Sequence, residues 1–243
     1  MNEMIIKTAE GHRDNGDLVV GNHLGKNNSR VSGVLRESCS LVYIEKFPEF
    51  KSKMRQAVAL TEKISIGIKS IINYSCNREP KAILYLEGDK HTFVPFIPDV
   101  AAPILNDMAD LTLAKRSLKG RKQFPKLQNF AEDVVDRYIA SKTGIKTDYT
   151  YGPRAFTVET AKFFNQYSRK DWGILTYPVV AALESGYTLA SVEVPGEPQP
   201  GYMKKYGNAG FFKHCAWRFL QNIPHILAAK KAVLDCRRLK LKS

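Results

Sequence analysis

The chain has 243 residues, and its 37 Lys and Arg against 24 Asp and Glu give a formal net charge of +13. A hydrophobic content of 44% and an aromatic content of 10% are those of a packed globular protein and exclude a disordered chain. The positive charge predicts an anionic partner, which could be nucleic acid, a membrane surface or a phosphorylated substrate.

The first part of the chain alternates strand and helix signals. Residues 1–16 are polar and mixed, so we expect little order there. A short strand, a Gly/Asn loop and the start of a helix are expected over 17–38, and a β-branched and aromatic strand over 40–47. Apolar residues at helical spacing predict an amphipathic helix over 51–75. The apolar run AILYLEGD (82–89) is typical of a strand in the middle of a sheet.

The alternation continues to residue 195. The predicted elements are a helix over 97–109, a strand over 110–116, a helix over 124–144 closed by Gly144, a short strand FTV (156–158), the helical segment TAKFFNQYS (160–168), a helix over 176–186 and a strand over 187–195. This pattern predicts an α/β sandwich with a mostly parallel sheet. Because no repeat or linker divides the chain, we expect one domain over 1–243, ending in a basic, aromatic tail over 202–243.

The cysteines are widely spaced and form no C-x-x-C pair: Cys39, Cys76, Cys215 and Cys236. This spacing gives neither a disulfide framework nor a zinc signature, so we expect reduced thiols in a cytoplasmic protein. There is no secretory signal, and no apolar window approaches the ~18–20 residues of a membrane span. We therefore expect a soluble protein, or one held peripherally at a membrane.

Two carboxylates, Glu87 and Asp89, end the apolar strand that begins at residue 82. Side chains two residues apart in an extended segment point to the same side, and ligands of open α/β sheets bind at the carboxyl ends of strands. Such a pair repels unless it shares a cation, and Mg²⁺ or Mn²⁺ accepts hard oxygen ligands. The sequence therefore predicts a metal site here; a solvated turn at the end of a strand is the alternative.

The order of strand, acid-x-acid, loop and I-P-x-x-x-x-P-I-L helix resembles the GT-A glycosyltransferases of the family-2 type. Their LDADxxxxPxxIPxLL segment carries a D-x-D metal motif, in which Glu87 would be the first acid, where most members have Asp. The resemblance implies a Rossmann-like three-layer α/β/α sandwich and a nucleotide-sugar donor. It also implies that Glu45 and Gly88 face the nucleotide, and that a late histidine, His214, is a further metal ligand. His91 is a second candidate, and a core or surface histidine is the alternative.

The stretch ADLTLAKRSLKGRKQFPKLQNF (109–130) looks like the strand and loop of polyprenyl-phosphate sugar transferases such as dolichol-phosphate mannose synthase. Arg116 falls on that family's arginine, which contacts acceptor phosphate. Six basic residues and no acid lie between Leu113 and Phe130, so Arg121 is a second candidate for binding phosphate. The alternative for this run of charge is a solvated face.

The segment DYTYGPRAF (148–156) resembles the DxxSGFRAF element of the same family, with coincidences at Asp148, Gly152, Arg154, Ala155 and Phe156. The resemblance implies that Asp148 is an acceptor-site carboxylate and the general base for a hydroxyl acceptor. It implies that Arg154 is the ion-pair partner of Asp148 or a phosphate ligand. The alternative is a structural Asp–Arg pair that braces a loop.

Two departures from the family pattern leave a non-catalytic GT-A scaffold open. Residues 171–195 follow the outline GWGFExELLxRAxxxGYRIxEVPV, but no carboxylate follows the Trp172-Gly173 pair. The first two strands also lack the usual PAYNE and DDGSxDxT signatures. The scaffold is therefore one alternative to a metal-dependent transferase.

The tail over 202–243 has ten Lys or Arg against one acid, Asp235, with aromatic residues between them. Basic amphipathic helices of this kind bind anionic membranes, and the resemblance adds a lipid phosphate as a possible acceptor. A packed terminal helix with a charged outer face is equally compatible. A nucleic-acid-binding module is a further alternative, although an unoccupied acidic pair at 87 and 89 would repel phosphates.

Overall fold

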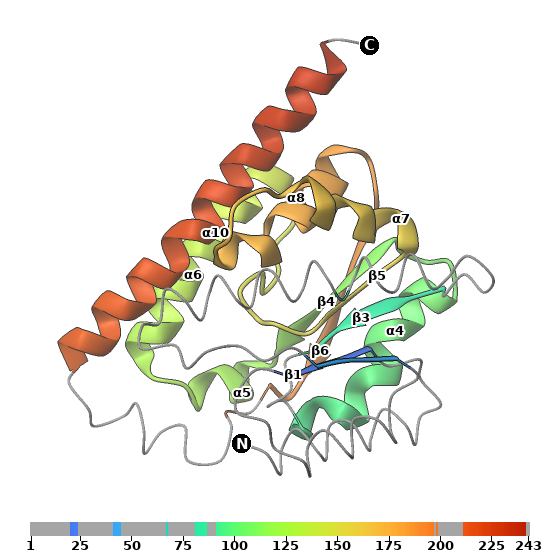
Figure 1. Ribbon diagram of the computed structural model, residues 1–243. Helices are drawn as coiled ribbons and strands as arrows, with labels where there is room; N and C mark the ends of the chain where they lie inside the picture. The colour runs from blue at the N-terminus through green and yellow to red at the C-terminus, as the bar shows by residue number, and fades with distance from the viewer. Residues whose placement is uncertain are drawn as a thin grey trace.

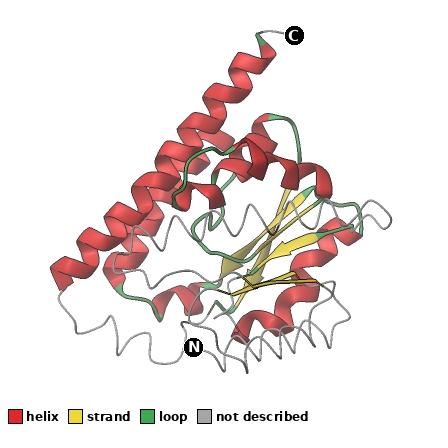
Figure 2. Ribbon diagram, viewed as in Figure 1, coloured by secondary structure: helices red, strands yellow, loops and turns green. Residues whose placement is uncertain are grey.

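A four-stranded sheet lies at the centre of the described part of the chain, between helices (Figure 1). The computed structural model describes residues 20–23, 41–44, 67, 81–86, 91–196, 198 and 211–241. Figure 2 shows the strands crossing the middle of the molecule and the longest helix running along one side. The predicted α/β class is therefore confirmed.

The order of the strands brings together segments from distant parts of the sequence. The sheet runs β3 (Ile83–Tyr85), β5 (Arg154–Phe156), β4 (Leu111–Arg116) and β6 (Leu189–Val194). The strands predicted over 110–116 and 187–195 are confirmed as β4 and β6. β3 lies inside the strand predicted over 82–89, whose residues 87–89 are outside the described part, but it lies at an edge of this four-stranded sheet and not in the middle as predicted.

A separate pair of parallel strands comes from the amino-terminal part of the chain. It joins β1 (Val20–His23) to β2 (Leu41–Ile44), which lies inside the predicted strand over 40–47. The helix predicted over 51–75 lies outside the described residues except for Gly67, which is helical. Residues 1–16 also lie outside the described part.

The direction of β5 corrects the prediction of a mostly parallel sheet. β4 and β6 are parallel, but β5 is antiparallel to both β3 and β4, so it runs against the other three strands of this sheet. The loop before β5 carries Asp148, and its ion pair with Arg116 holds that loop at the carboxyl end of β4. β5 therefore has to start at this edge, where β3, β4 and β6 all end.

Helices cover both faces of the sheet, and each face has its own apolar cluster. On one face, Val100 and Ile104 of α4 (Ile97–Leu105) pack with Ala155 of β5. The other face is covered by α6 (Lys126–Thr143), α8 (Tyr177–Glu184) and α10 (Phe211–Lys240), whose apolar residues cluster with Leu111 and Leu113 of β4. Each face buries apolar side chains, which is the main source of stability in such layers.

Short helical turns connect these elements. They are η2 (His91–Phe96), α5 (Leu118–Lys122), α7 (Val158–Ala161), η3 (Lys162–Gln166) and η4 (Trp172–Leu175). The strand predicted over 156–158 ends earlier, at Phe156, because the Thr157 side chain accepts a hydrogen bond from the Thr160 amide and caps α7. Thr157 is therefore the capping residue of α7 and not the middle of a strand.

The helix predicted over 124–144 is confirmed as α6, and it ends as expected at Gly144. Gly144 has φ 74°, a left-handed conformation that suits glycine, and its amide donates to the Ala140 carbonyl oxygen at 2.8 Å. The loop that follows leads directly to Asp148, so this cap sets where the site begins.

In the described part of the tail, residues 211–240 form a helix of 30 residues, α10, and one face of it is packed into the core. Ala228, Ala229 and Ala232 are buried, and such small side chains allow close approach to α8 and η4. The expectation of a packed terminal helix is therefore confirmed for α10. No helix in the described part of the chain combines the length and apolar character that a membrane span requires.

Replacing Gly173 by Ala is expected to destabilise the contact between η4 and α10. A Cβ at Gly173 would overlap the Tyr167 hydroxyl and lie 2.7 Å from Ala228 Cβ and 2.8 Å from the Pro224 carbonyl oxygen. Overpacking of this kind costs about 1–3 kcal/mol, and here a helix backbone would have to move. Urea unfolding measures the loss. Gly144→Ala is the control, since a Cβ there meets nothing within 4 Å and costs only the left-handed φ; equal losses would contradict the overlap.

Candidate functional site

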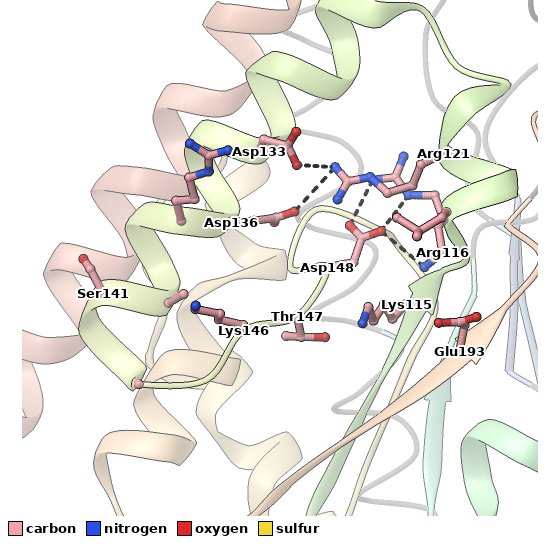
Figure 3. A pocket seen from close by; sticks show the side chains of 14 residues that line it. Lys115, Arg116, Arg121, Asp133, Asp136, Ser141, Lys146, Thr147, Asp148 and Glu193 are labelled. Carbon is pink, nitrogen blue, oxygen red and sulfur yellow. Dashed lines mark hydrogen bonds and ion pairs between the residues drawn. The ribbon is translucent and has the colours of Figure 1, made fainter.

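A cavity of about 770 Å³ lies beside the carboxyl ends of β4 and β6, with α6 on its other side (Figure 3). Five basic residues line it: Lys115, Arg116, Arg121, Arg137 and Lys146. Four carboxylates also line it: Asp133, Asp136, Asp148 and Glu193. The cavity is therefore a charged site at the edge of the sheet where ligands of α/β proteins bind.

Arg116 and Asp148 form a buried bidentate ion pair in the wall of this cavity. Arg116 Nε donates to Asp148 Oδ2 at 2.7 Å and Arg116 Nη2 donates to Oδ1 at 2.9 Å. The two residues are only 3% and 2% exposed. Paired N–H···O bonds between charged groups fix both side chains in one geometry. The structure thus joins two predicted site residues that lie 32 positions apart in the sequence.

The guanidinium of Arg116 has further partners. Its Nη2 lies 2.8 Å from Glu132 Oε2 on α6, and its centre lies 5.1 Å from the Phe124 ring and 5.2 Å from the Tyr151 ring. Burial lowers the pKa of Arg116, but the charges of Asp148 and Glu132 outweigh burial, so its pKa lies above the ordinary value. The guanidinium therefore stays charged inside the protein.

Gly196, which follows β6, leaves space for the side chain of Arg116. A Cβ at Gly196 would overlap the Arg116 Cγ, and Gly196 has φ 64°. Both the left-handed backbone and the lack of a side chain are needed for this close approach. The segment after β6 therefore helps to position Arg116.

Asp148 is fully hydrogen-bonded. Besides Arg116, its Oδ1 accepts from the Tyr151 amide at 3.2 Å and from the Thr150 hydroxyl at 3.3 Å. Burial raises the pKa of the Asp148 carboxyl, but the charge and hydrogen bonds of Arg116 outweigh burial and hold the pKa below its ordinary value. A carboxylate of lowered pKa is a weak base, so this geometry favours a role for Asp148 in orienting Arg116.

Arg121 lies beside the first pair and is less buried. Its Nη2 is 2.8 Å from Asp133 Oδ1 and 4.0 Å from Asp136 Oδ2, and its side chain is 22% exposed. Arg121 lines the cavity together with both carboxylates. The two arginines predicted from the basic stretch therefore meet at one site, and each is held by acids of α6.

Asp136 is a site residue that the sequence reasoning missed. Its Oδ1 accepts from the amides of Tyr149 at 2.9 Å and Thr150 at 3.2 Å, whereas its Oδ2 is buried and accepts no hydrogen bond. Burial, together with the negative charge of Asp148, raises the pKa of the Asp136 carboxyl well above its ordinary value. Asp136, which lines the cavity, therefore has an acceptor oxygen to which a ligand could donate a hydrogen bond.

A signal for Asp136 was present in the sequence. Glu132, Asp133 and Asp136 share one helix, and a basic stretch directly precedes that helix. Acids three or four positions apart on a helix, as Asp133 and Glu132 are from Asp136, lie on neighbouring parts of its surface. Comparing the charges of adjacent segments would have pointed to this cluster.

Arg154 does not form the bidentate pair with Asp148 that was one of its two predicted roles. It is 1% exposed, and its guanidinium donates to the carbonyl oxygens of Gly152 at 2.9 Å, Tyr151 at 2.9 Å and Tyr149 at 3.3 Å, and also to that of Leu175. Arg116, and not Arg154, is the bidentate partner of Asp148. Arg154 satisfies backbone acceptors of the loop and so braces it from inside.

The other predicted site residues cannot be placed in the same way. Glu45, Glu87, Gly88 and Asp89 lie outside the described residues, and the side chains of His91 and His214 do so as well. Among the residues that the structure describes, no group of three or more His, Cys, Asp or Glu could hold a metal ion. The metal site over Glu87 and Asp89 stays a prediction.

The register of the sheet nevertheless relates the end of β3 to the cavity. Tyr85, Arg154 and Leu113 are aligned across neighbouring strands, and Arg116 lies three residues farther along β4. β3 and β4 run in the same direction and are separated by one strand, about 10 Å apart at the usual strand spacing. The chain therefore leaves β3 at the same edge of the sheet as Arg116.

The segment after Trp172 has no free carboxylate in the described structure. Ile174 and Leu175 are buried, and the neighbouring acid, Asp171, caps η4 by accepting from the Gly173 amide at 2.9 Å. Asp171 also accepts from the Tyr167 hydroxyl at 2.5 Å. The residues around Trp172 are thus used for packing and capping.

Comparisons of this chain with protein-family models, with curated proteins and with solved structures find no match. Its function is therefore inferred from the residues and the geometry described above.

Proposed function

We propose that the chain is a metal-dependent glycosyltransferase of the GT-A type, which transfers a sugar from a nucleotide-sugar to an acceptor. The observation that carries the proposal is the bidentate pair of Arg116 and Asp148. Two separate motif resemblances select these residues, and the residues meet in the wall of one cavity. Two unrelated local matches would have no reason to converge on one ion pair.

The arrangement of layers supports the fold part of the proposal. α4 packs on one face of the sheet, whereas α6, α8 and α10 pack on the other, as a three-layer α/β/α sandwich requires. Three strands of this sheet end at one edge, and the predicted acid-x-acid follows the end of β3 directly. This is the edge at which open α/β sheets bind ligands.

The donor set proposed for the metal is the carboxylate pair Glu87 and Asp89. Two carboxylates are hard oxygen ligands of the kind that Mg²⁺ and Mn²⁺ prefer, so these residues fit such an ion. A cation bound there offsets the charge of a diphosphate leaving group. Gly88, between the two acids in the sequence, has no side chain to keep a donor from the backbone.

The cavity supports an anionic acceptor. Lys115, Arg137 and Lys146 line it, and no ion pair engages them among the described residues. A phosphate acceptor is already ionised and needs charge neutralisation rather than a base. A hydroxyl acceptor would need a base, and Asp136, with its raised pKa and unbonded oxygen, suits this role better than Asp148.

A non-catalytic scaffold is the second candidate, and one observation favours it. The groups of Arg116 and Asp148 are engaged with each other and with neighbouring protein atoms, as in a structural pair. A nucleic-acid-binding module is less favoured, because four carboxylates line the cavity beside its cations.

A thermal-shift panel of UDP-, GDP- and dTDP-sugars, each with and without Mn²⁺, tests the proposal. One nucleotide-sugar with Mn²⁺ is expected to raise the Tm by about 5–10 °C at 100-fold excess over its Kd, through about 2.7 kcal/mol of binding free energy. The double variant Glu87→Gln/Asp89→Asn should lose this shift and keep the Tm of the free protein.

Asp107→Asn is the matched control, since it removes a carboxylate elsewhere and Asn tolerates the left-handed φ of 56° at that position. The control should keep the full shift. If millimolar nucleotide-sugars leave the Tm unchanged, the scaffold is the better account of the chain.

A further inference from the structure

α10 exposes a row of apolar and basic side chains on the side that faces away from the core. The residues of the row are three or four positions apart, and the last of them directly follows α10, where its amide donates to the Arg237 carbonyl oxygen. They are Leu220, Ile223, Leu227, Lys230, Leu234, Arg237 and Leu241. We call these residues the α10 seam. A mean interval of 3.5 residues keeps them on one side of the helix, over about 32 Å of its length.

The apolar members of the seam are well exposed. Leu220 is 61% exposed, Leu234 is 45% exposed and Leu241 is 87% exposed, whereas Ala229 and Ala232 on the packed side are fully buried. In Figure 1 the carboxyl-terminal turns of α10 extend past the other described elements. A row of exposed apolar side chains, here interrupted by two cations, marks a surface for interaction.

The charge of the seam is exclusively positive. Lys230 and Arg237 belong to it, and Arg238 is exposed beside it. Asp235 is the one acid between residues 211 and 243, and its carboxylate accepts from Lys231 Nζ at 2.6 Å and from the Tyr177 hydroxyl at 2.9 Å. The partner of the seam must therefore be both apolar and anionic.

A second copy of the chain fits this seam poorly. In a coiled coil with Leu220, Leu227 and Leu234 at the first core position of each heptad, Lys230 and Arg237 would occupy the second. Two such helices would bring like charges together in the middle of the contact. The pattern therefore disfavours a symmetric helical dimer.

We propose that the α10 seam binds the surface of an anionic lipid bilayer. The helix lies along the membrane, with the leucines of the seam among the upper acyl chains. Lys230 and Arg237 extend their aliphatic stems along the interface and place their charges at the headgroups. This binding is independent of the proposed transferase activity, because the seam contains none of the cavity residues.

Co-sedimentation with vesicles of phosphatidylcholine, with and without 30% phosphatidylglycerol (an arbitrary working fraction, roughly that of an anionic membrane), tests the proposal. The full chain is expected to bind only the anionic vesicles, and less strongly as salt rises. Leu227→Gln/Leu234→Gln should lower the partition coefficient about tenfold, and Lys230→Gln/Arg237→Gln about thirtyfold.

Two matched variants show whether membrane binding depends on residues of the α10 seam or on any exposed apolar or basic side chains. Leu105→Gln/Met108→Gln removes exposed apolar side chains near the end of α4, and Lys81→Gln/Lys142→Gln removes two exposed cations elsewhere. Both should bind like the unmodified chain. Equal binding by all variants, binding to pure phosphatidylcholine, or a solution dimer that Leu227→Gln/Leu234→Gln dissociates would overturn the proposal. Circular dichroism confirms that each variant is folded.

Discussion

Replacing Arg116 by Ala is expected to lower the free energy of unfolding by about 3–5 kcal/mol. The substitution leaves the carboxylates of Asp148 and Glu132 buried without their common counter-charge. Urea unfolding at neutral pH measures the loss. Arg116→Lys should restore the positive charge but not the two parallel hydrogen bonds. Its free energy of unfolding should therefore lie between those of the unmodified chain and Arg116→Ala.

Two further variants separate the ion pair from general effects of removing an arginine. Arg121→Ala breaks a pair whose side chains are 22% and 41% exposed, and it should cost less than about 1 kcal/mol. Arg116→Ala/Asp148→Asn should cost clearly less than the sum of its single changes, because no unpaired charge remains at position 148. Additive losses would mean that the pair is not coupled as its geometry implies.

The second large effect concerns His225, which should make the protein sensitive to acid. His225 is buried on α10, and its Nδ1 lies 2.7 Å from the Thr176 hydroxyl. Burial, followed by the charge of Arg154, lowers its pKa from 6.5 to about 3. Between these two values the unfolded chain binds a proton that the folded chain does not. The stability that the neutral His225 provides is therefore fully present above pH 6.5. Below pH 6.5 the free energy of unfolding falls by about 1.4 kcal/mol for each pH unit.

His225→Asn provides the comparison, since the Asn side chain can replace the bond from Nδ1 and does not titrate. Its stability should be lower than that of the unmodified chain at pH 7.5 and should change less between pH 6.5 and 5. Over that interval the histidine is expected to cost about 2 kcal/mol. Parallel curves for the two proteins would show that His225 does not govern the acid transition.

Asp136 changes the pH dependence of stability in the opposite direction to His225. A curve of stability against pH for the unmodified chain therefore contains both titrations. The folded pKa of Asp136 is raised above 3.8, and its contribution therefore declines as the pH rises from 3.8 toward the folded pKa. Asp136→Asn removes this decline and should steepen the net rise in stability with pH. Measuring it together with His225→Asn separates the two titrations.

Local patterns in the sequence predicted those parts of the fold that local chemistry determines. The glycine at 144 closes α6 because a left-handed residue ends a helix wherever that helix lies. The segments of β3, β4 and β6 are rich in apolar, β-branched or aromatic residues, which favour strands locally, although β3 and β6 lie at the edges of the four-stranded sheet. Arg116 was selected differently, by a resemblance to a family motif and by the basic run around it, and the structure places it in the wall of the cavity.

The direction of β5 and the roles of Arg154 and Asp136 could not be predicted in this way. The direction of β5 depends on where its preceding loop is held, and this depends on a contact between Asp148 and Arg116. The role of Arg154 depends on which backbone carbonyls lack partners nearby. The charge pattern of the sequence points to the acids of α6, but the raised pKa of Asp136 follows from its burial and its neighbouring charges. Each of these properties is set by packing between distant segments.

The long separation between β4 and β6 has a consequence for synthesis on the ribosome. Leu111 pairs with Leu189, so 78 residues must be added after the start of β4 before the first residue of its parallel partner is present. Closing so large a loop is entropically costly, and an unpaired strand edge is prone to join another chain. A nascent chain that stalls between these strands would therefore present β4 to aggregation, which makes the interval between residues 116 and 189 the vulnerable stage of folding.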